Sequence, residues 1–477
     1  MSPHNKSFSR RSALKGTALV SLAQILGACD QEEWLLEQLS HGHTGHEGGH
    51  GDVWGSYGKL VAQDGVISLP KGFRYVAFAA AGSSMSDGRS MPGAHDGMAC
   101  FAGKGSLVFL VRNHELSQND VPSGDARFYD ELGGGGVTIS VFDTKTGREV
   151  RSFAALLGTI ENCNGGNSLR GGWLTCEETT EGLAAGYSKP HGYVFEVPAT
   201  SQGLIETPVA LKAMGRFEHE AARQDPKTGV VYMTEDNGDP ADGFYRFVPH
   251  DKFDLAQGGV LQVLAIQGKP QHVTYEGQTV GVEYSTEWVD IADPDPESAE
   301  DDPGAVFKQG LALGAAQFMG LEGLALQDGV AYFVASEAGD AEKGQVWSFT
   351  PHGEGGKLKL LYESRDGSVL DQPDNITISP KGAIMMCEDG DGEDIDGGDN
   401  WLRVLTQRGQ VFDFAQNIKP IDLHEIDDED FPEPGASFGA SEFSGVCFSP
   451  DGKWMFLNVQ YPGLTLAITG PWERGAI

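Results

Sequence analysis

The sequence predicts an all-β protein and, more narrowly, a six-bladed β-propeller. From about Val53 onward the chain consists of short apolar runs bounded by Gly, Pro, Asp and Asn, with scarcely any helical periodicity. Glycine accounts for 66 of 477 residues without a collagen-like repeat, which indicates many tight turns. A hairpin-like unit also recurs six times along the chain, and such repetition is typical of a propeller.

The recurring unit is a pair of apolar strands joined by a turn that contains glycine. An acid or an asparagine stands at the start of the first strand, and a polar cluster ends the second, as in WLTCEE at 173–178. The six copies cover residues 96–115, 162–178, 220–236, 322–337, 374–389 and 442–460. Further strand-like segments of the sequence follow the hairpins and can complete each blade. Because a propeller places its innermost strands around a central channel, we expect the hairpins to line that channel.

The ends of the hairpins bring acidic residues together. In a hairpin the two ends farthest from the turn lie side by side, so Glu220 and Glu235 should meet at one edge of their sheet. Glu322 and Glu337 repeat that spacing. If the hairpins are the innermost strands, side chains from all blades converge on the channel. This predicted ring consists of Glu115, Cys176, Glu177, Glu220, Glu235, Glu322, Glu337, Asp374, Glu388 and Glu442.

A metal site in the central channel is the expected consequence of such a ring. Carboxylates this close cannot all remain ionised unless cations neutralise them or their pKa values rise steeply. Many oxygen ligands favour Ca²⁺, whereas the softer thiolate of Cys176 favours a transition ion, iron or zinc. The alternative for Cys176 is a small buried apolar residue, which is also our interpretation of Cys387.

The overall charge of the chain limits which molecules can bind to it. The chain has 34 basic and 69 acidic residues, a formal net charge of −35, so nucleic acid and anionic membrane surfaces would be repelled. No Gly-Lys phosphate loop occurs in the sequence. Its absence argues against nucleotide motors, and the net charge leaves cations as the natural partners.

The N-terminal segment has the features of an export signal. Residues 1–29 resemble a twin-arginine export signal, and Leu26-Gly27-Ala28-Cys29 resembles a lipobox, in which Cys29 would carry a lipid anchor. Simple cleavage nearby without a lipid is the alternative. Residues 30–52 form a His- and Gly-rich linker, and 53–477 form the propeller domain. We therefore expect an exported protein that is either periplasmic or a membrane-anchored lipoprotein.

Six short motifs resemble, in order, the motif series of the PhoX family of bacterial alkaline phosphatases. They are RNHE (112–115), NCNGG (162–166), GWLTCEE (172–178), GRFEHEAA (215–222), QPDNI (372–376) and CEDG (387–390). The resemblance runs from about Leu69 to Tyr461, nearly the whole predicted mature chain. It implies a six-bladed propeller that hydrolyses phosphate monoesters at an iron and calcium cluster in its channel.

The resemblance also implies roles for individual residues. The positions that match iron ligands, and hence the catalytic residues, are Cys176, Glu220 and Glu322. The further metal ligands are Glu115, Glu177, Glu337, Asp374 and Glu388, with calcium as the expected ion for most of them. The expected protein is a monomeric metallophosphatase that uses Fe³⁺ and calcium on a small phosphoester substrate.

One motif departs from the family pattern. Larger members have Arg-Pro-Glu where this chain has Gly320-Leu321-Glu322, so the arginine that contacts substrate phosphate is missing. Other candidates for that positive charge are Arg216, Arg223, Arg246 and Arg403. Two alternative functions stay open, a calcium-dependent propeller hydrolase of lactones or other esters and a non-catalytic, calcium-stabilised binding propeller. Iron together with calcium would favour the phosphatase.

Overall fold

The computed structural model describes residue 55 and residues 57–119, 124–390, 400–419 and 441–477. The predicted export signal at 1–29, its Cys29, and the predicted linker at 30–52 lie outside these residues. Within the described part of the chain, no helix combines the length and the apolar character needed to span a bilayer.

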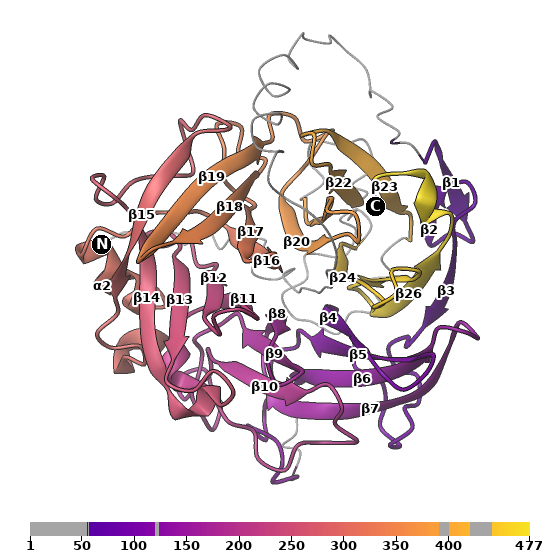
Figure 1. The fold of residues 1–477 in the computed structure, drawn as a ribbon. Helices are drawn as coiled ribbons and strands as arrows, with labels where there is room; N and C mark the ends of the chain where they lie inside the picture. The colour runs from indigo at the N-terminus through magenta and orange to yellow at the C-terminus, as the bar shows by residue number, and fades with distance from the viewer. Residues whose placement is uncertain (1–54, 56, 120–123, 391–399, 420–440) are drawn as a thin grey trace, which may run out of the picture.

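The chain folds as an all-β propeller, with strands arranged around a central axis (Figure 1). This confirms the all-β propeller part of the predicted fold class. Among the described residues there is one α-helix, α2 (Ala305–Ala312). The short 3₁₀ turns are η2 (Lys212–Met214), η3 (Leu255–Gln257), η4 (Glu297–Glu300) and η5 (Trp472–Arg474).

The described strands form five hydrogen-bonded sheets, all built from antiparallel pairs. One four-stranded sheet contains β4 (His95–Ala102), β5 (Leu107–His114), β6 (Gly135–Asp143) and β7 (Arg148–Thr159). A three-stranded sheet contains β8 (Asn162–Asn167), β9 (Gly172–Glu177) and β10 (Val194–Pro198). The second four-stranded sheet contains β3 (Arg74–Phe78), β24 (Phe443–Phe448), β25 (Met455–Val459) and β26 (Leu464–Thr469).

The two larger sheets account for the remaining strands. The six-stranded sheet contains β1 (Leu60–Gln63), β2 (Ile67–Pro70), β20 (Pro373–Ile378), β21 (Ile384–Glu388), β22 (Trp401–Leu405) and β23 (Val411–Asn417). The nine-stranded sheet begins with β11 (His219–Gln224), β12 (Val231–Glu235), β13 (Phe244–Pro249), β14 (Gly259–Ile266) and β15 (Glu283–Asp290). It continues through β19 (Gly355–Glu363), β18 (Gln345–His352), β17 (Val330–Ala335) and β16 (Leu321–Gln327).

The hydrogen bonding does not divide the chain into six separate blades. Strand β15 pairs with β19 from Glu283 to Thr286, and this pairing joins two hairpin units into one nine-stranded sheet. Strand β3, near the start of the domain, completes the sheet of β24–β26 near its end, which closes the ring. The blade count of six therefore stays a prediction, while the propeller architecture is established.

The strands nearest the axis are the first strands of the predicted hairpins (Figure 1). In chain order β4, β8, β11, β16, β20 and β24 each contact the next, and β24 contacts β4. Each of the six has a β-bulge at the same place, where it carries one residue more than its partner strand. The first residues inside these bulges are Asp96, Cys163, Glu220, Glu322, Asp374 and Gly445. Since a bulge redirects side chains, this one position decides which residues face the axis.

Glycine at the second bulge position allows neighbouring inner strands to approach closely. A Cβ at Gly97 would lie 2.6 Å from the carbonyl oxygen of Cys163, and one at Gly323 would lie 2.6 Å from that of Asp374. Either contact is too short for a side chain, so these two glycines allow β4 to lie close to β8, and β16 close to β20.

Candidate metal centre

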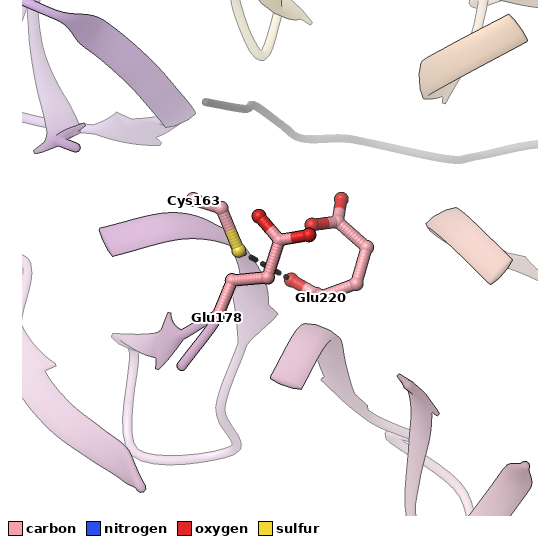
Figure 2. A group of neighbouring side chains, drawn as sticks. All are labelled: Cys163, Glu178 and Glu220. Atoms are coloured by element: carbon pink, nitrogen blue, oxygen red, sulfur yellow. Dashed lines mark hydrogen bonds between the residues drawn. The ribbon is translucent and has the colours of Figure 1, made fainter. Parts of the chain in front are cut away.

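Three overlapping groups of metal-binding side chains meet at the axis. Within each group the candidate ligand atoms lie within 4.8 Å of one another. The groups are Cys163 with Glu178 and Glu220, then Glu178 with Asp236 and Glu322, and finally Glu220 with Glu322 and Asp374. Figure 2 shows the first group, in which the thiol and two carboxylates from separate segments gather in one place.

Two positions in the repeated hairpin supply all six ligands. Four of them, Cys163, Glu220, Glu322 and Asp374, occupy the first bulge position of an inner strand. Glu178 and Asp236 come directly after the second strands β9 and β12. Because each pair of groups has one carboxylate in common, the three groups form a continuous patch of ligands and not three isolated sites.

The backbone of Glu161 holds two of these ligands at a fixed separation. Its carbonyl oxygen accepts the N–H groups of Cys163 and Glu178, each at 2.9 Å. Glu161 has a φ of 45°, in the left-handed region that residues other than glycine rarely adopt. Such a conformation persists where surrounding contacts enforce it, and it often accompanies functional sites.

The buried carboxylates are electrostatically incomplete without a cation. Burial raises the pKa of Asp374 well above its ordinary range, and the neighbouring Glu322 and Glu220 raise it further. The Oδ1 atom of Asp374 is buried and has no hydrogen-bond partner among the described residues. Both oxygens of Asp96 are also buried without a hydrogen-bond partner among the described residues. Burial raises the pKa of Asp96, and the nearby Glu115 raises it further. Buried carboxylates without donors are costly unless they are neutralised, so this geometry suits bound cations.

The thiol in the first group needs a cation before it can act as a thiolate. Burial raises the pKa of Cys163 well above the ordinary thiol value, and the carboxylates of Glu220 and Glu178 add to that shift. Its Sγ lies 3.1 Å from the carbonyl oxygen of His219 and donates to it. A metal ion would reverse this balance because coordination stabilises the deprotonated sulfur.

The family follows from a comparison with known protein families. The family model described as "Alkaline phosphatase PhoX" matches residues 56–463, most of the chain. The chain belongs to the PhoX family. The resemblance predicted from the six motifs is therefore confirmed, and membership supports a phosphatase that acts on a small molecule.

Comparisons outside the family are more distant. No curated protein matches the PhoX chain. A gluconolactonase from Xanthomonas campestris is 12% identical with a TM-score of 0.38, and the match covers 83% of this chain and 100% of that one. Regucalcin, a calcium-binding protein from Agrobacterium tumefaciens, is 9% identical with a TM-score of 0.36, covering 80% and 92%. A β-propeller domain of Cps50 (Swd1) from Myceliophteria thermophila is 10% identical with a TM-score of 0.39, covering 83% and 100%. Likeness this low says nothing about the chemistry of the PhoX chain.

The PhoX structure brings together three of the predicted ligands, Glu220, Glu322 and Asp374. It places a different thiol beside them. Cys163 occupies the bulge of β8, whereas Cys176 lies on β9, opposite that bulge and paired with Val194 of β10. Burial raises the pKa of Cys176, and Glu220 is near enough to raise it further, but Cys176 is not part of any of the ligand groups found among the described residues. Cys163 is thus a candidate ligand that the sequence-based choice left out, and the role of Cys176 as an iron ligand stays a prediction.

Glu177, predicted as a metal ligand, makes contacts within its blade and belongs to none of the ligand groups found among the described residues. Its carboxylate accepts backbone N–H groups from Ile160 at 3.1 Å, Gly192 at 2.9 Å and Tyr193 at 3.1 Å, and lies 2.6 Å from Nδ1 of His191. These contacts occupy both carboxylate oxygens inside the blade. The next residue, Glu178, is the one that joins two of the ligand groups.

At other hairpins, too, an acid at the end of the second strand bonds within its blade. Glu235 accepts hydrogen bonds from Gly243 N at 2.9 Å and Tyr245 Oη at 2.7 Å, while the following Asp236 belongs to a ligand group. Glu388, predicted as a ligand, accepts bonds from the backbone N–H of Asp371 and from Nε of Arg403, each at 2.8 Å. Glu388 therefore acts as a buried ion-pair partner within its blade.

Two further predicted ligands lie outside the three groups. Burial raises the pKa of Glu115, and the nearby Glu178 raises it further, so Glu115 borders the centre. Its Oε2 accepts a hydrogen bond from Gln460 at 3.0 Å. Glu337 is only partly buried and is likewise absent from the groups formed by the described residues.

Most of the candidate arginines are already engaged. Arg216 donates to backbone carbonyls in the loop that follows Glu178, at 2.8 Å for the two shortest bonds. Arg246 donates to a strand-pairing glutamine at 2.6 Å, and Arg403 pairs with two acids. Arg223 is buried without a partner among the described residues, so burial lowers its pKa to about 9. None of these contacts supplies a phosphate-binding arginine at the ligand groups.

Sequence reasoning could have found the missed ligands from the repeat itself. Aligning NCNGG (162–166) with the later copies places Cys163 in the position of Glu220 and Glu322. Strand alternation offers a second signal, because adjacent residues such as Glu177 and Glu178 point to opposite sides.

Proposed function

We propose that this chain is an exported phosphatase that hydrolyses phosphate monoesters at a cluster of iron and calcium ions in the propeller channel. The observation that carries the proposal is the convergence of one thiol and five carboxylates at the axis of a PhoX-family chain. Family membership supports the reaction class, and the geometry of the ligand groups supports the proposed place of the reaction.

The donor set fits the proposed ions. The group with Cys163 combines sulfur and oxygen donors, which suits iron better than calcium. The group of Glu220, Glu322 and Asp374 offers oxygen alone, which suits calcium. The buried Oδ1 of Asp374, which lacks a partner among the described residues, supports a cation at this group.

When bound, such ions polarise a phosphoryl group and neutralise the charge that develops during in-line displacement. The chain's own residues hold and orient that charge. Ser336 donates to Oε1 of Glu322 at 2.9 Å, which fixes this shared carboxylate between two ligand groups. All six ligands are acidic or sulfur side chains, so a phosphate dianion would be repelled by the protein alone. Substrate binding would depend on the ions.

The protein would then have low selectivity among its substrates. Arg216, Arg246 and Arg403 are committed to structural contacts, and Gly320-Leu321-Glu322 offers no replacement. We infer a broad range of small phosphoesters bound chiefly through the phosphoryl group. We also propose six blades, counting the nine-stranded sheet as two, and a monomer exported by the twin-arginine pathway, with Cys29 free or lipidated.

The test uses protein exported by its own pathway, so that the native ions are retained. Elemental analysis should find iron and calcium together, and a chromogenic phosphate monoester should be hydrolysed. A lactone and a carboxylic ester are assayed in parallel. Calcium without iron, together with hydrolysis of the lactone and not of the phosphoester, would overturn the proposal.

A further inference from the structure

The carboxamide of Asn113 is fully hydrogen-bonded beside the first ligand group. Its Nδ2 donates to the carbonyl oxygens of Cys163 at 2.7 Å and Asn164 at 2.9 Å. Its Oδ1 accepts from Nε1 of Trp173 at 2.8 Å and from Oγ1 of Thr175 at 2.9 Å. Because an indole nitrogen can only donate, the orientation of this amide is unambiguous. Asn113 therefore links strand β5 to the bulge of β8 in the neighbouring sheet.

The side chain of Asn164 connects this hydrogen-bonded group to the candidate ligand Glu220. Its Oδ1 accepts the N–H of Gly165 at 2.7 Å, so its Nδ2 must be the donor that reaches Oε1 of Glu220 at 3.0 Å. Both asparagines are completely buried. Hydrogen bonds thus link the indole of Trp173 through Asn113 to the backbone of Asn164, whose side chain in turn donates to the Glu220 carboxylate.

We propose that Asn164 is a positioning residue that holds Glu220 in its metal-binding orientation, and that Asn113 supports it. The amide donates to Oε1 of Glu220 and so restrains the orientation of the carboxylate. Being neutral, the amide does not cancel the carboxylate charge, as a lysine or arginine would. Partners that orient a metal ligand in this way typically change metal affinity or activity by about 10–100-fold when they are removed.

This inference rests on the proposed metal centre but not on the identity of the reaction. Its primary measurement is therefore retention of the bound metal. Wild type and Asn164→Ala, both purified with their native metal, are dialysed against graded EDTA, and the remaining iron and calcium are measured. We expect Asn164→Ala to lose half of its metal at an EDTA concentration about 10–100-fold lower than wild type.

The chain offers a matched control. Asn375 occupies the same second bulge position in β20 and is equally buried, but its Oδ1 accepts only the N–H of Gly445, at 3.2 Å. Asn375→Ala should therefore lose stability as Asn164→Ala does, while keeping the metal as tightly as wild type. Asn164→Ser, which keeps a polar group for Gly165 but is too short to reach Glu220, serves if the alanine variant fails to fold.

The outcomes separate the two proposals. Equal metal retention by wild type and the Asn164 variants would overturn the positioning role. Retention lowered only in the Asn164 variants, with a shifted absorption band of the thiolate-bound iron, would support it. If wild type keeps its metal but hydrolyses no phosphoester, the proposed reaction fails while this comparison still decides the role of Asn164. A wild type that binds no metal would overturn both.

Discussion

Two acids that adjoin in the sequence, Glu177 and Glu178, have opposite surroundings. Glu177 points into its blade, where three backbone N–H groups and His191 occupy its oxygens. Glu178 points to the axis and belongs to two ligand groups. Glu235 and Asp236 repeat this difference in the next sheet. In these two hairpins one acid is held by contacts within the blade, and the next is a candidate cation ligand, because adjacent side chains point to opposite sides.

The largest expected effect concerns the acid inside the blade. Glu177→Ala leaves three backbone N–H groups and His191 without their buried partner, so we expect a loss of about 3–5 kcal/mol in the free energy of unfolding. Glu178→Ala should lose less than about 1 kcal/mol when both variants are unfolded by urea with excess chelator present. Similar losses in the two variants would remove the distinction between the two acids.

The two cysteines extend the comparison to activity. Cys163→Ser should lose bound iron and lower kcat/KM for a phosphoester by more than about 100-fold, because it removes a ligand itself and not merely its support. Cys176→Ser should keep its iron and most of its activity. The measurements are elemental analysis and steady-state kinetics. Loss of iron in Cys176→Ser alone would restore the original sequence-based choice.

Removal of the metal should make the stability depend on pH. In the metal-free protein the folded-state pKa values of Asp96 and Asp374 are raised above the ordinary aspartate value of 3.8. Their contribution to stability is present below that unfolded-state value and is lost as pH rises through the folded-state pKa. Melting temperatures of EDTA-treated protein should therefore fall from about pH 5 to pH 8. The metal-loaded protein should show a weaker dependence, and equal slopes would argue against cations at these carboxylates.

The smallest expected effect concerns His191, which lies inside the blade beside Glu177. Burial lowers its pKa, but Glu177 and Asp130 outweigh burial and leave the pKa above the ordinary value of 6.5. The stabilisation is complete below pH 6.5 and is lost as pH rises through the folded-state pKa. His191→Gln, which can still donate to Glu177 but does not titrate, should flatten this part of the stability profile. A profile identical to wild type would exclude His191 as its source.

Much of the site could be predicted because its residues repeat at regular spacing. Glu220, Glu322 and Asp374 stand at the same position in three hairpin units, and the structure brings them together. The sequence-based choice of Cys176 followed the end of the second strand. It overlooked Cys163, which lies in the bulge of the first strand and belongs to a candidate ligand group. The bulge is a register shift between two strands, and neither strand alone contains it.

The sequence by itself determined the strand pattern, the acid-rich hairpin ends and the family, since each of these depends on residue type and local spacing. Only the tertiary structure decided which acid of each adjacent pair faces the axis, which cysteine joins them and which asparagines hold them. Those choices depend on contacts between strands more than 50 residues apart, such as Asn113 with Asn164 and Asn164 with Glu220. Contacts of that kind exist only after the inner strands have closed around the axis, because closure alone brings their side chains within hydrogen-bonding distance.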